Sequence, residues 1–157
     1  MRNLFKTIGA STFACLSMMV SAQDITGSWQ TIDDKTGATK GIVEIKKESN
    51  GTYSGVIVHI TPHIGYQPKE FCINCPAPYT NKPILGMKAI TDLKAINNYE
   101  YENGKILDPN IGRIYKLKVK MSQNGTKLNV RGYYGFSTIG RNQTWIRINP
   151  TQLPQSN

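Results

Sequence analysis

Alternation of apolar and polar residues is the feature of this sequence that most constrains its fold. In the stretch RIYKLKVKMS, residues 113–122, one face carries Tyr115, Leu117, Val119 and Met121, and the other carries three lysines. This period of two is typical of a half-buried β-strand, because successive side chains of a strand point to opposite faces. No segment has the periodicity of a convincing amphipathic helix. The sequence therefore predicts an all-β protein.

Three Asn-Gly pairs separate the alternating segments: Asn50-Gly51, Asn103-Gly104 and Asn124-Gly125. Asn-Gly is favoured in tight hairpins because both residues tolerate a positive φ angle. Three such hairpins predict an antiparallel meander, and closure into a single up-and-down barrel would hide the edges of its short strands. The expected strands are residues 27–33, 41–48, 52–60, 84–93, 99–102, 105–108, 113–122, 127–134 and 143–148.

The N-terminal segment has the features of a secretory signal peptide. Arg2 and Lys6 precede a mostly apolar segment, residues 8–20, and a small-x-small cleavage motif ends at Ala22. We therefore expect export to the periplasm or beyond, with residues 1–22 removed as the signal peptide. Cys15 lies inside the apolar segment and leaves lipid attachment as an alternative.

The expected mature chain is one domain with a short tail. Residues 23–149 are long enough for one barrel domain, and residues 150–157 are expected to form a flexible C-terminal tail. Loss of the two basic residues of the signal peptide leaves 17 basic and 10 acidic residues, a net charge of +7. This charge favours an anionic envelope component as a partner, and nucleic acid is not expected outside the cytoplasm. Lysines that keep the outer faces of strands soluble are the simpler explanation.

No later segment approaches the roughly 20 apolar residues that a membrane span requires. No Ser-His-Asp grouping with a supporting motif is present either, so no catalytic residue is expected.

The first and last expected strands carry a matched pair of motifs. GSW places Trp29 two residues after Gly27, and TWIR places Arg147 on the same face as Trp145. In a closed up-and-down barrel these strands are neighbours, so Arg147 can lie over the Trp29 indole, a contact worth about 0.5–2 kcal/mol. The four residues are therefore assigned a structural role at the barrel floor. This arrangement resembles that of the lipocalins and other calycin barrels.

Longer motifs extend the resemblance along the chain. They are DITGSWQT (24–31), KPILGM (82–87), NGKILDPNIGRIYKLKVKM (103–121) and LNVRGYYGFSTIGRNQTWIR (128–147). In this order they look like the secreted bacterial family called domain of unknown function 2147. The resemblance implies an exported lipocalin-like barrel with no established catalytic activity, and it supplies neither a cofactor nor a substrate.

The segment EFCINCPAP, residues 70–78, contains Cys72 and Cys75, for which three interpretations remain. In an oxidising compartment the first is a disulfide that clips the tip of a long loop at the barrel mouth. The second is a metal site, because His59 and His63 precede the cysteines and these ligand types suit zinc or copper(I). The third, redox catalysis, lacks the helix that thioredoxin-type chemistry requires.

The strand around Arg131 contains the candidate ligand-binding residues. Arg131 and Tyr133 share one face, and an inward Arg-x-Tyr pair resembles the carboxylate site of fatty-acid-binding barrels. Alternatively, Leu128 and Val130 face inward and Arg131 faces water, and the period of two makes these arrangements exclusive. Arg131, Tyr133 and Tyr115 are the candidate ligand-binding residues.

The sequence therefore favours a non-enzymatic barrel that binds a small apolar or amphipathic molecule. Two alternatives stay open: an envelope structural or interaction module with a filled core, and a metal-handling protein that uses the His and Cys residues.

Overall fold

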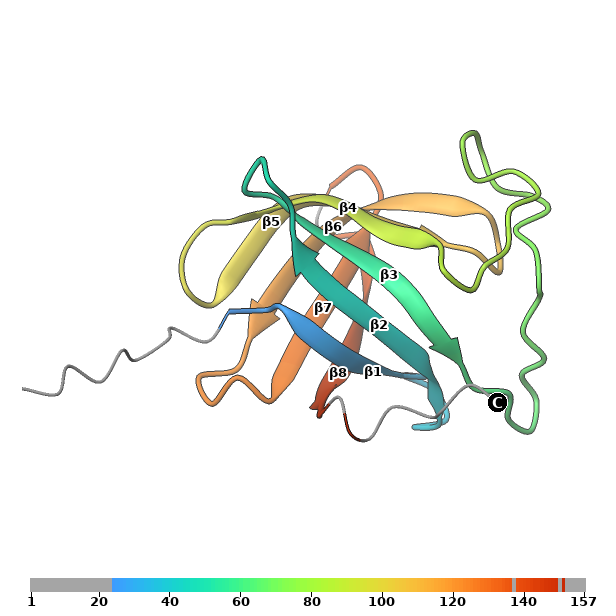
Figure 1. The fold of residues 1–157 in the computed structure, drawn as a ribbon, viewed down its shortest axis with the longest axis horizontal. Helices are drawn as coiled ribbons and strands as arrows, with labels where there is room; N and C mark the ends of the chain where they lie inside the picture. The colour runs from blue at the N-terminus through green and yellow to red at the C-terminus, as the bar shows by residue number, and fades with distance from the viewer. Residues whose placement is uncertain (1–23, 137, 150, 152–157) are drawn as a thin grey trace, which may run out of the picture.

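The computed structural model describes residues 24–136, 138–149 and 151, which form a closed antiparallel β-barrel (Figure 1). Consecutive strands are neighbours, and the last strand pairs with the first to close the barrel. The expected up-and-down barrel is confirmed. The expected signal peptide lies outside the described residues, as does most of the expected tail. The strands are β1 (Gly27–Ile32), β2 (Thr39–Lys47), β3 (Tyr53–Ile60), β4 (Lys88–Ala95), β5 (Glu100–Asp108), β6 (Arg113–Met121), β7 (Lys127–Tyr133) and β8 (Gly140–Ile148).

Alternation on β6 divides its side chains between the barrel interior and solvent. Leu117, Val119 and Met121 are buried in the core. Lysines of the same strand form ion pairs with the two glutamates of β5 on the outer face. The period of two in the sequence therefore reports the inward and outward faces of the strand correctly.

Two of the three Asn-Gly pairs form the expected hairpins, β2–β3 at Asn50-Gly51 and β6–β7 at Asn124-Gly125. In both turns the glycine has a positive φ, 81° at Gly51 and 67° at Gly125. Each Asn side chain accepts a hydrogen bond from the backbone N–H two residues later, over 3.0 and 3.2 Å. The Asn side chain and the glycine together therefore fix the turn.

The third pair, Asn103-Gly104, is not a hairpin, and the expectation of two strands here is wrong. β5 runs through it as one strand with a bulge, so the barrel has eight strands within the described residues rather than nine. Asn103 has a φ of 60°. A Cβ on Gly104 would lie 2.8 Å from Leu93 Cδ1, so glycine allows β4 to approach closely. The turn between β4 and β5 instead follows Ala95, where Ile96 N donates to Glu100 O over 2.8 Å.

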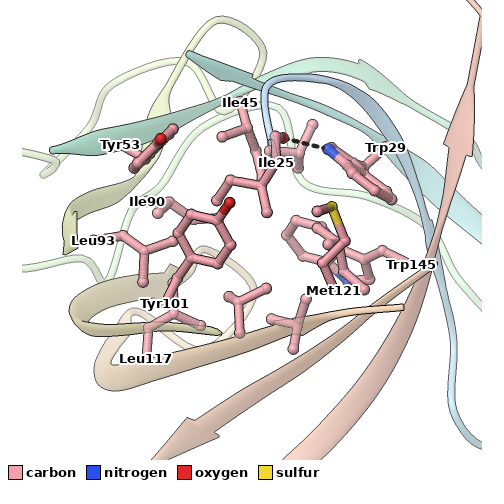
Figure 2. Packing of buried hydrophobic residues seen from close by; sticks show 14 residues of the cluster. Ile25, Trp29, Ile45, Tyr53, Ile90, Leu93, Tyr101, Leu117, Met121 and Trp145 are labelled. Carbon is pink, nitrogen blue, oxygen red and sulfur yellow. Dashed lines mark hydrogen bonds between the residues drawn. The ribbon is translucent and has the colours of Figure 1, made fainter. Parts of the chain in front are cut away.

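Trp29 and Arg147 pack together at the end of the barrel where the described chain enters. They are direct partners across β1 and β8, and the Arg147 guanidinium carbon lies 4.2 Å from the indole centroid. The indole N–H donates to Ile25 O over 2.8 Å, as Figure 2 shows. Gly27 has a φ of 121°, and a Cβ there would lie 3.1 Å from Arg147 Nη1. The structure thus brings these residues together as the motifs indicated.

Apolar side chains pack around Trp29 and fill this part of the barrel (Figure 2). The core makes one end of the barrel solid, and we call it the closed end. We call the opposite end, with the β1–β2, β3–β4, β5–β6 and β7–β8 connections, the mouth (Figure 1). The core cluster consists of Ile25, Trp29, Val43, Ile45, Tyr53, Ile90, Leu93, Tyr101, Leu117, Val119, Met121, Leu128, Val130 and Trp145.

Candidate ligand-binding cavity

A cavity of about 1020 Å³ occupies the mouth half of the barrel. Its floor is the upper layer of the core, including Val43, Ile90, Val130 and Trp145. Isoleucines of β2, β3 and β5 contribute to its walls. A cavity of this size and apolar character is typical of sites for small molecules.

The gap between β3 and β5 at the mouth is covered by a loop instead of a strand. β4 begins only at Lys88, and its pairing with β3 reaches no further than Val56. Beyond that point Ile57 N donates to Met87 O over 2.9 Å, and Gly86 N donates to Ile57 O over 2.7 Å. Residues 84–87, which we call the wall segment, therefore continue the barrel wall.

The long β3–β4 connection, residues 61–87, has its own apolar cluster. Cys72, Cys75, Ile84 and Met87 are buried together with Leu107 of β5. The two cysteines form the expected disulfide. We expected this disulfide to clip the tip of a mouth loop, and its sulfurs lie inside the cluster, since Cys72 is 0% and Cys75 5% exposed. The disulfide therefore closes a short ring within the loop and packs it against the barrel wall.

Polar contacts tie the same loop to the β5–β6 connection across the mouth. Tyr66 OH and Asn110 Oδ1 are 3.4 Å apart, and Lys69 Nζ donates to Asn110 O over 3.0 Å. A Cβ on Gly112 would overlap the carbonyl of Asn74, so glycine is required where the two loops meet. The long loop is thus a fixed rim of the cavity.

Charged side chains surround the mouth. Lys40 lines the cavity, lies 3.7 Å from Asp33 and stacks over the Tyr66 ring at 5.0 Å. Arg141 Nε donates to Asp34 Oδ2 over 2.7 Å, and this hydrogen bond holds the pKa of Asp34 below its ordinary value. The β1–β2 turn is therefore fixed to β8 by an ion pair.

Arg113, at the start of β6, also lines the cavity, and it forms no ion pair within the described part of the chain. It is therefore a cation at the mouth whose charge is available to a bound molecule.

The structure separates the three candidate ligand-binding residues. Tyr115 and Tyr133 both line the cavity, but Arg131 does not. Arg131 Nη1 donates to Asn142 Oδ1 over 2.9 Å on the outer face of β7 and β8. Leu128 and Val130 are buried in the core. Of the two exclusive arrangements of β7, the one with Leu128 and Val130 inward is present.

Gly132 and Gln143 also line the cavity, and neither was expected there from the sequence. The nearest atoms to a Cβ on Gly132 would be Ile106 Cγ2 and Tyr115 Cβ, each at 3.6 Å, so the missing side chain leaves space inside the cavity. The position of Gly132 two residues after Val130 was a usable signal. Gln143 Oε1 accepts the Trp145 indole N–H over 3.0 Å and fixes the ring in the cavity floor.

The His and Cys residues are not assembled as a metal site. His59 lines the cavity, whereas the His63 ring lies 5.1 Å from that of Tyr66. The sulfurs of Cys72 and Cys75 are bonded to each other. Within the described residues, no three His, Cys, Asp or Glu side chains are placed to hold a metal ion. In the same part of the chain, no helix has the length and apolar character to cross a bilayer.

We compared the chain with known proteins. No curated protein matches the chain. A similar solved structure is protein HP1028 from the human pathogen Helicobacter pylori, which is described as belonging to the lipocalin family. The two chains are 23% identical with a TM-score of 0.69, and the match covers 82% of this chain and 86% of that chain. This likeness concerns the fold.

Residues 27–147, from the first strand to Arg147, match the sequence profile of a family described as uncharacterized protein conserved in bacteria (DUF2147). The matched range contains all the motifs at the barrel floor and all the residues that line the cavity. The chain therefore belongs to the DUF2147 family, and its barrel has the lipocalin fold.

Proposed function

We propose that this protein is an exported, non-enzymatic carrier or receptor that binds a small apolar or amphipathic molecule in its barrel. The observation that supports this most is the cavity of about 1020 Å³ in the mouth half of the barrel. Close packing is the rule inside proteins, so an open apolar volume of this size needs an explanation. The filled-core alternative fits less well, because the core cluster occupies only the closed end.

The distribution of polar groups favours an amphipathic ligand over a purely apolar one. Apolar side chains form the floor, whereas Lys40, His59 and Arg113 lie toward the mouth. A ligand with an apolar body would bury it against Val130 and Trp145 and leave a polar or anionic head near Lys40 and Arg113. Tyr115 and Tyr133 are the proposed contacts between the two regions.

Export is part of this proposal and rests on residues 1–22. The basic start, the apolar segment and the small-x-small motif support cleavage after Ala22. N-terminal sequencing of the protein from its native envelope should find Gln23 or a neighbouring residue. A mature pool that retains Met1 would contradict export by this route.

A substitution at Gly132 tests the cavity as the ligand site. Gly132→Trp places an indole between Ile106 and Tyr115 without a backbone clash, because the Cβ would make only ordinary contacts. Titration with the amphipathic dye 1-anilinonaphthalene-8-sulfonate should show one site, and the substitution should weaken its binding about tenfold, equivalent to about 1.4 kcal/mol.

Asn129→Trp is the matched control, because Asn129 is an exposed residue of the same strand. It should leave dye binding unchanged. Near-ultraviolet circular dichroism of both variants checks that the barrel is intact. Equal dye binding by the wild type and Gly132→Trp would place the dye elsewhere and contradict the proposed site.

A further inference from the structure

Exposed apolar side chains gather at the mouth of the barrel. Single exposed apolar residues are normal on a protein surface, but their concentration in one region marks an interaction site. Only Ile96 and Tyr99 of the large exposed hydrophobic residues found in the described chain lie at the closed end, in the β4–β5 turn. The others are on three mouth loops: Ile64, Phe71, Ile73, Leu85, Ile111, Tyr134, Phe136 and Ile139.

Five of these side chains form what we call the rim patch: Ile73, Ile111, Tyr134, Phe136 and Ile139. Three of the five, from the β5–β6 and β7–β8 loops, line the cavity opening itself. Phe136 lies between two of them in sequence and is 81% exposed. Ile73 precedes Asn74, whose carbonyl abuts the β5–β6 loop at Gly112. The rim patch therefore borders the entrance to the cavity.

Basic residues accompany the rim patch. Lys69 donates to the carbonyl of Asn110, next to Ile111, and Lys116 Nζ lies 3.5 Å from the carbonyl of Gly135, next to Phe136. Arg113 follows Ile111 by two residues. None of these three cations is in an ion pair within the described residues. On the barrel wall, by contrast, several lysines pair with Asp or Glu.

We propose that the mouth docks onto an anionic lipid bilayer, with the rim patch inserted among the headgroups and the surrounding cations paired with lipid phosphates. Apolar and aromatic side chains flanked by Lys and Arg are the combination that binds the interface of an anionic membrane. A second copy of this chain fits less well, because a mouth-to-mouth contact would set the same cations opposite each other. The apolar side chains also lie on separate loop tips, which suit a soft surface.

This proposal goes beyond the proposed function, since the patch could bind a bilayer whether or not the cavity is occupied. If both hold, the cavity opens directly toward the membrane. An amphipathic molecule could then pass between the bilayer and the barrel with little exposure to water.

Co-sedimentation with lipid vesicles tests the proposal. The protein used in this experiment should begin at Gln23, because residues 1–22 are apolar enough to bind lipid themselves. All eight strands lie after this residue. It should bind vesicles that mix phosphatidylglycerol with phosphatidylcholine, bind phosphatidylcholine alone about tenfold more weakly, and lose affinity as salt is raised. Absence of binding to the anionic vesicles would overturn the proposal, and equal binding to both would overturn the role of the cations.

Two pairs of variants locate the contact. Ile73→Ser with Phe136→Ser should weaken vesicle binding about tenfold, whereas Ile96→Ser with Tyr99→Ser at the closed end should not change it. Lys69→Gln with Lys116→Gln, at the mouth, should weaken binding more than Lys94→Gln with Lys127→Gln. If the closed-end double variants weaken vesicle binding as much as the mouth double variants do, the proposed orientation of the barrel on the membrane is wrong.

Two further measurements distinguish membrane docking from ligand binding in the cavity and from dimerisation. The Ile73 and Phe136 positions do not line the cavity, so their double variant should still bind the dye. Lost vesicle binding with retained dye binding would therefore affect this proposal alone. Concentration-dependent dimerisation that the same double variant abolishes, without vesicle binding by the wild type, would identify a second copy as the occupant and overturn the membrane proposal.

Discussion

At the scale of single residues, the closed end of the barrel depends on a partly buried guanidinium that is held by backbone carbonyls. The Arg147 guanidinium donates to the carbonyls of Thr26 and Asp24, each over 2.7 Å, and to that of Gly125 over 2.6 Å. Burial lowers the pKa of Arg147, but each hydrogen bond satisfies a donor that would otherwise be costly to bury. Arg147 thereby fixes residues 24–26 across the barrel floor.

Tyr53 gives the closed end a predicted dependence on alkaline pH. Its hydroxyl donates to Asp24 Oδ2 over 3.1 Å, and burial together with the Asp24 carboxylate raises the pKa of Tyr53 to about 12. The neutral phenol is therefore favoured in the folded state. Its contribution to stability should be complete below pH 10, the ordinary pKa, and should be lost as the pH rises toward about 12.

Urea denaturation at a series of pH values measures this effect. Tyr53→Phe should unfold more easily than the wild type at neutral pH and should show a smaller loss of stability between pH 10 and 12. Tyr134→Phe, which removes an exposed phenol, is the matched control and should follow the wild type. Parallel curves for Tyr53→Phe and the wild type above pH 10 would show that Tyr53 does not carry the dependence.

At the scale of structural elements, part of the long β3–β4 connection takes the place of a strand in the barrel wall. Its wall segment hydrogen-bonds to Ile57 where β4 is missing, and its disulfide is packed against Leu107. Sequence periodicity could not identify it, because a loop that forms a wall has no alternation of its own. Its stability depends instead on contacts with β3 and β5.

Removing the disulfide should cost moderate stability without unfolding the barrel. The ring closed by Cys72 and Cys75 is short, so chain entropy predicts a loss of about 2 kcal/mol for Cys72→Ala with Cys75→Ala. The corresponding Ser pair should lose about 1–3 kcal/mol more, because it would bury hydroxyl groups among Ile84, Met87 and Leu107. Urea denaturation of both pairs gives the comparison. Equal stability of the Ala and Ser pairs would mean that the sulfurs are not buried.

At the scale of the whole molecule, the barrel combines a solid closed end with a hollow mouth. The closed end was predictable, because Gly27, Trp29 and Arg147 are local motifs and closure alone makes the first and last strands neighbours. The bulge at Gly104 was not predictable from the sequence, since it depends on the close approach of Leu93 from another strand. The orientation of Arg131 was likewise open, because period two defines two faces without saying which is inside.

The exposed rim was missed for a related reason. Alternation identifies buried faces of strands, but the apolar residues of the mouth lie in loops, where no period applies. Their meaning emerges only when closure of the barrel collects three loops around one opening.

The shortened β4 also imposes an order on folding. β5 to β8 are joined by short connections and can pair early, as can β1 to β3, because local contacts form fastest. The wall segment has its full set of partners only when both groups have met, since its hydrogen bonds reach Ile57 on one side and its apolar contacts reach Leu107 on the other. The wall segment is therefore the last part of the wall to acquire protection from amide hydrogen exchange and the first to lose it. Local opening of the barrel should begin between β3 and β5 at this segment.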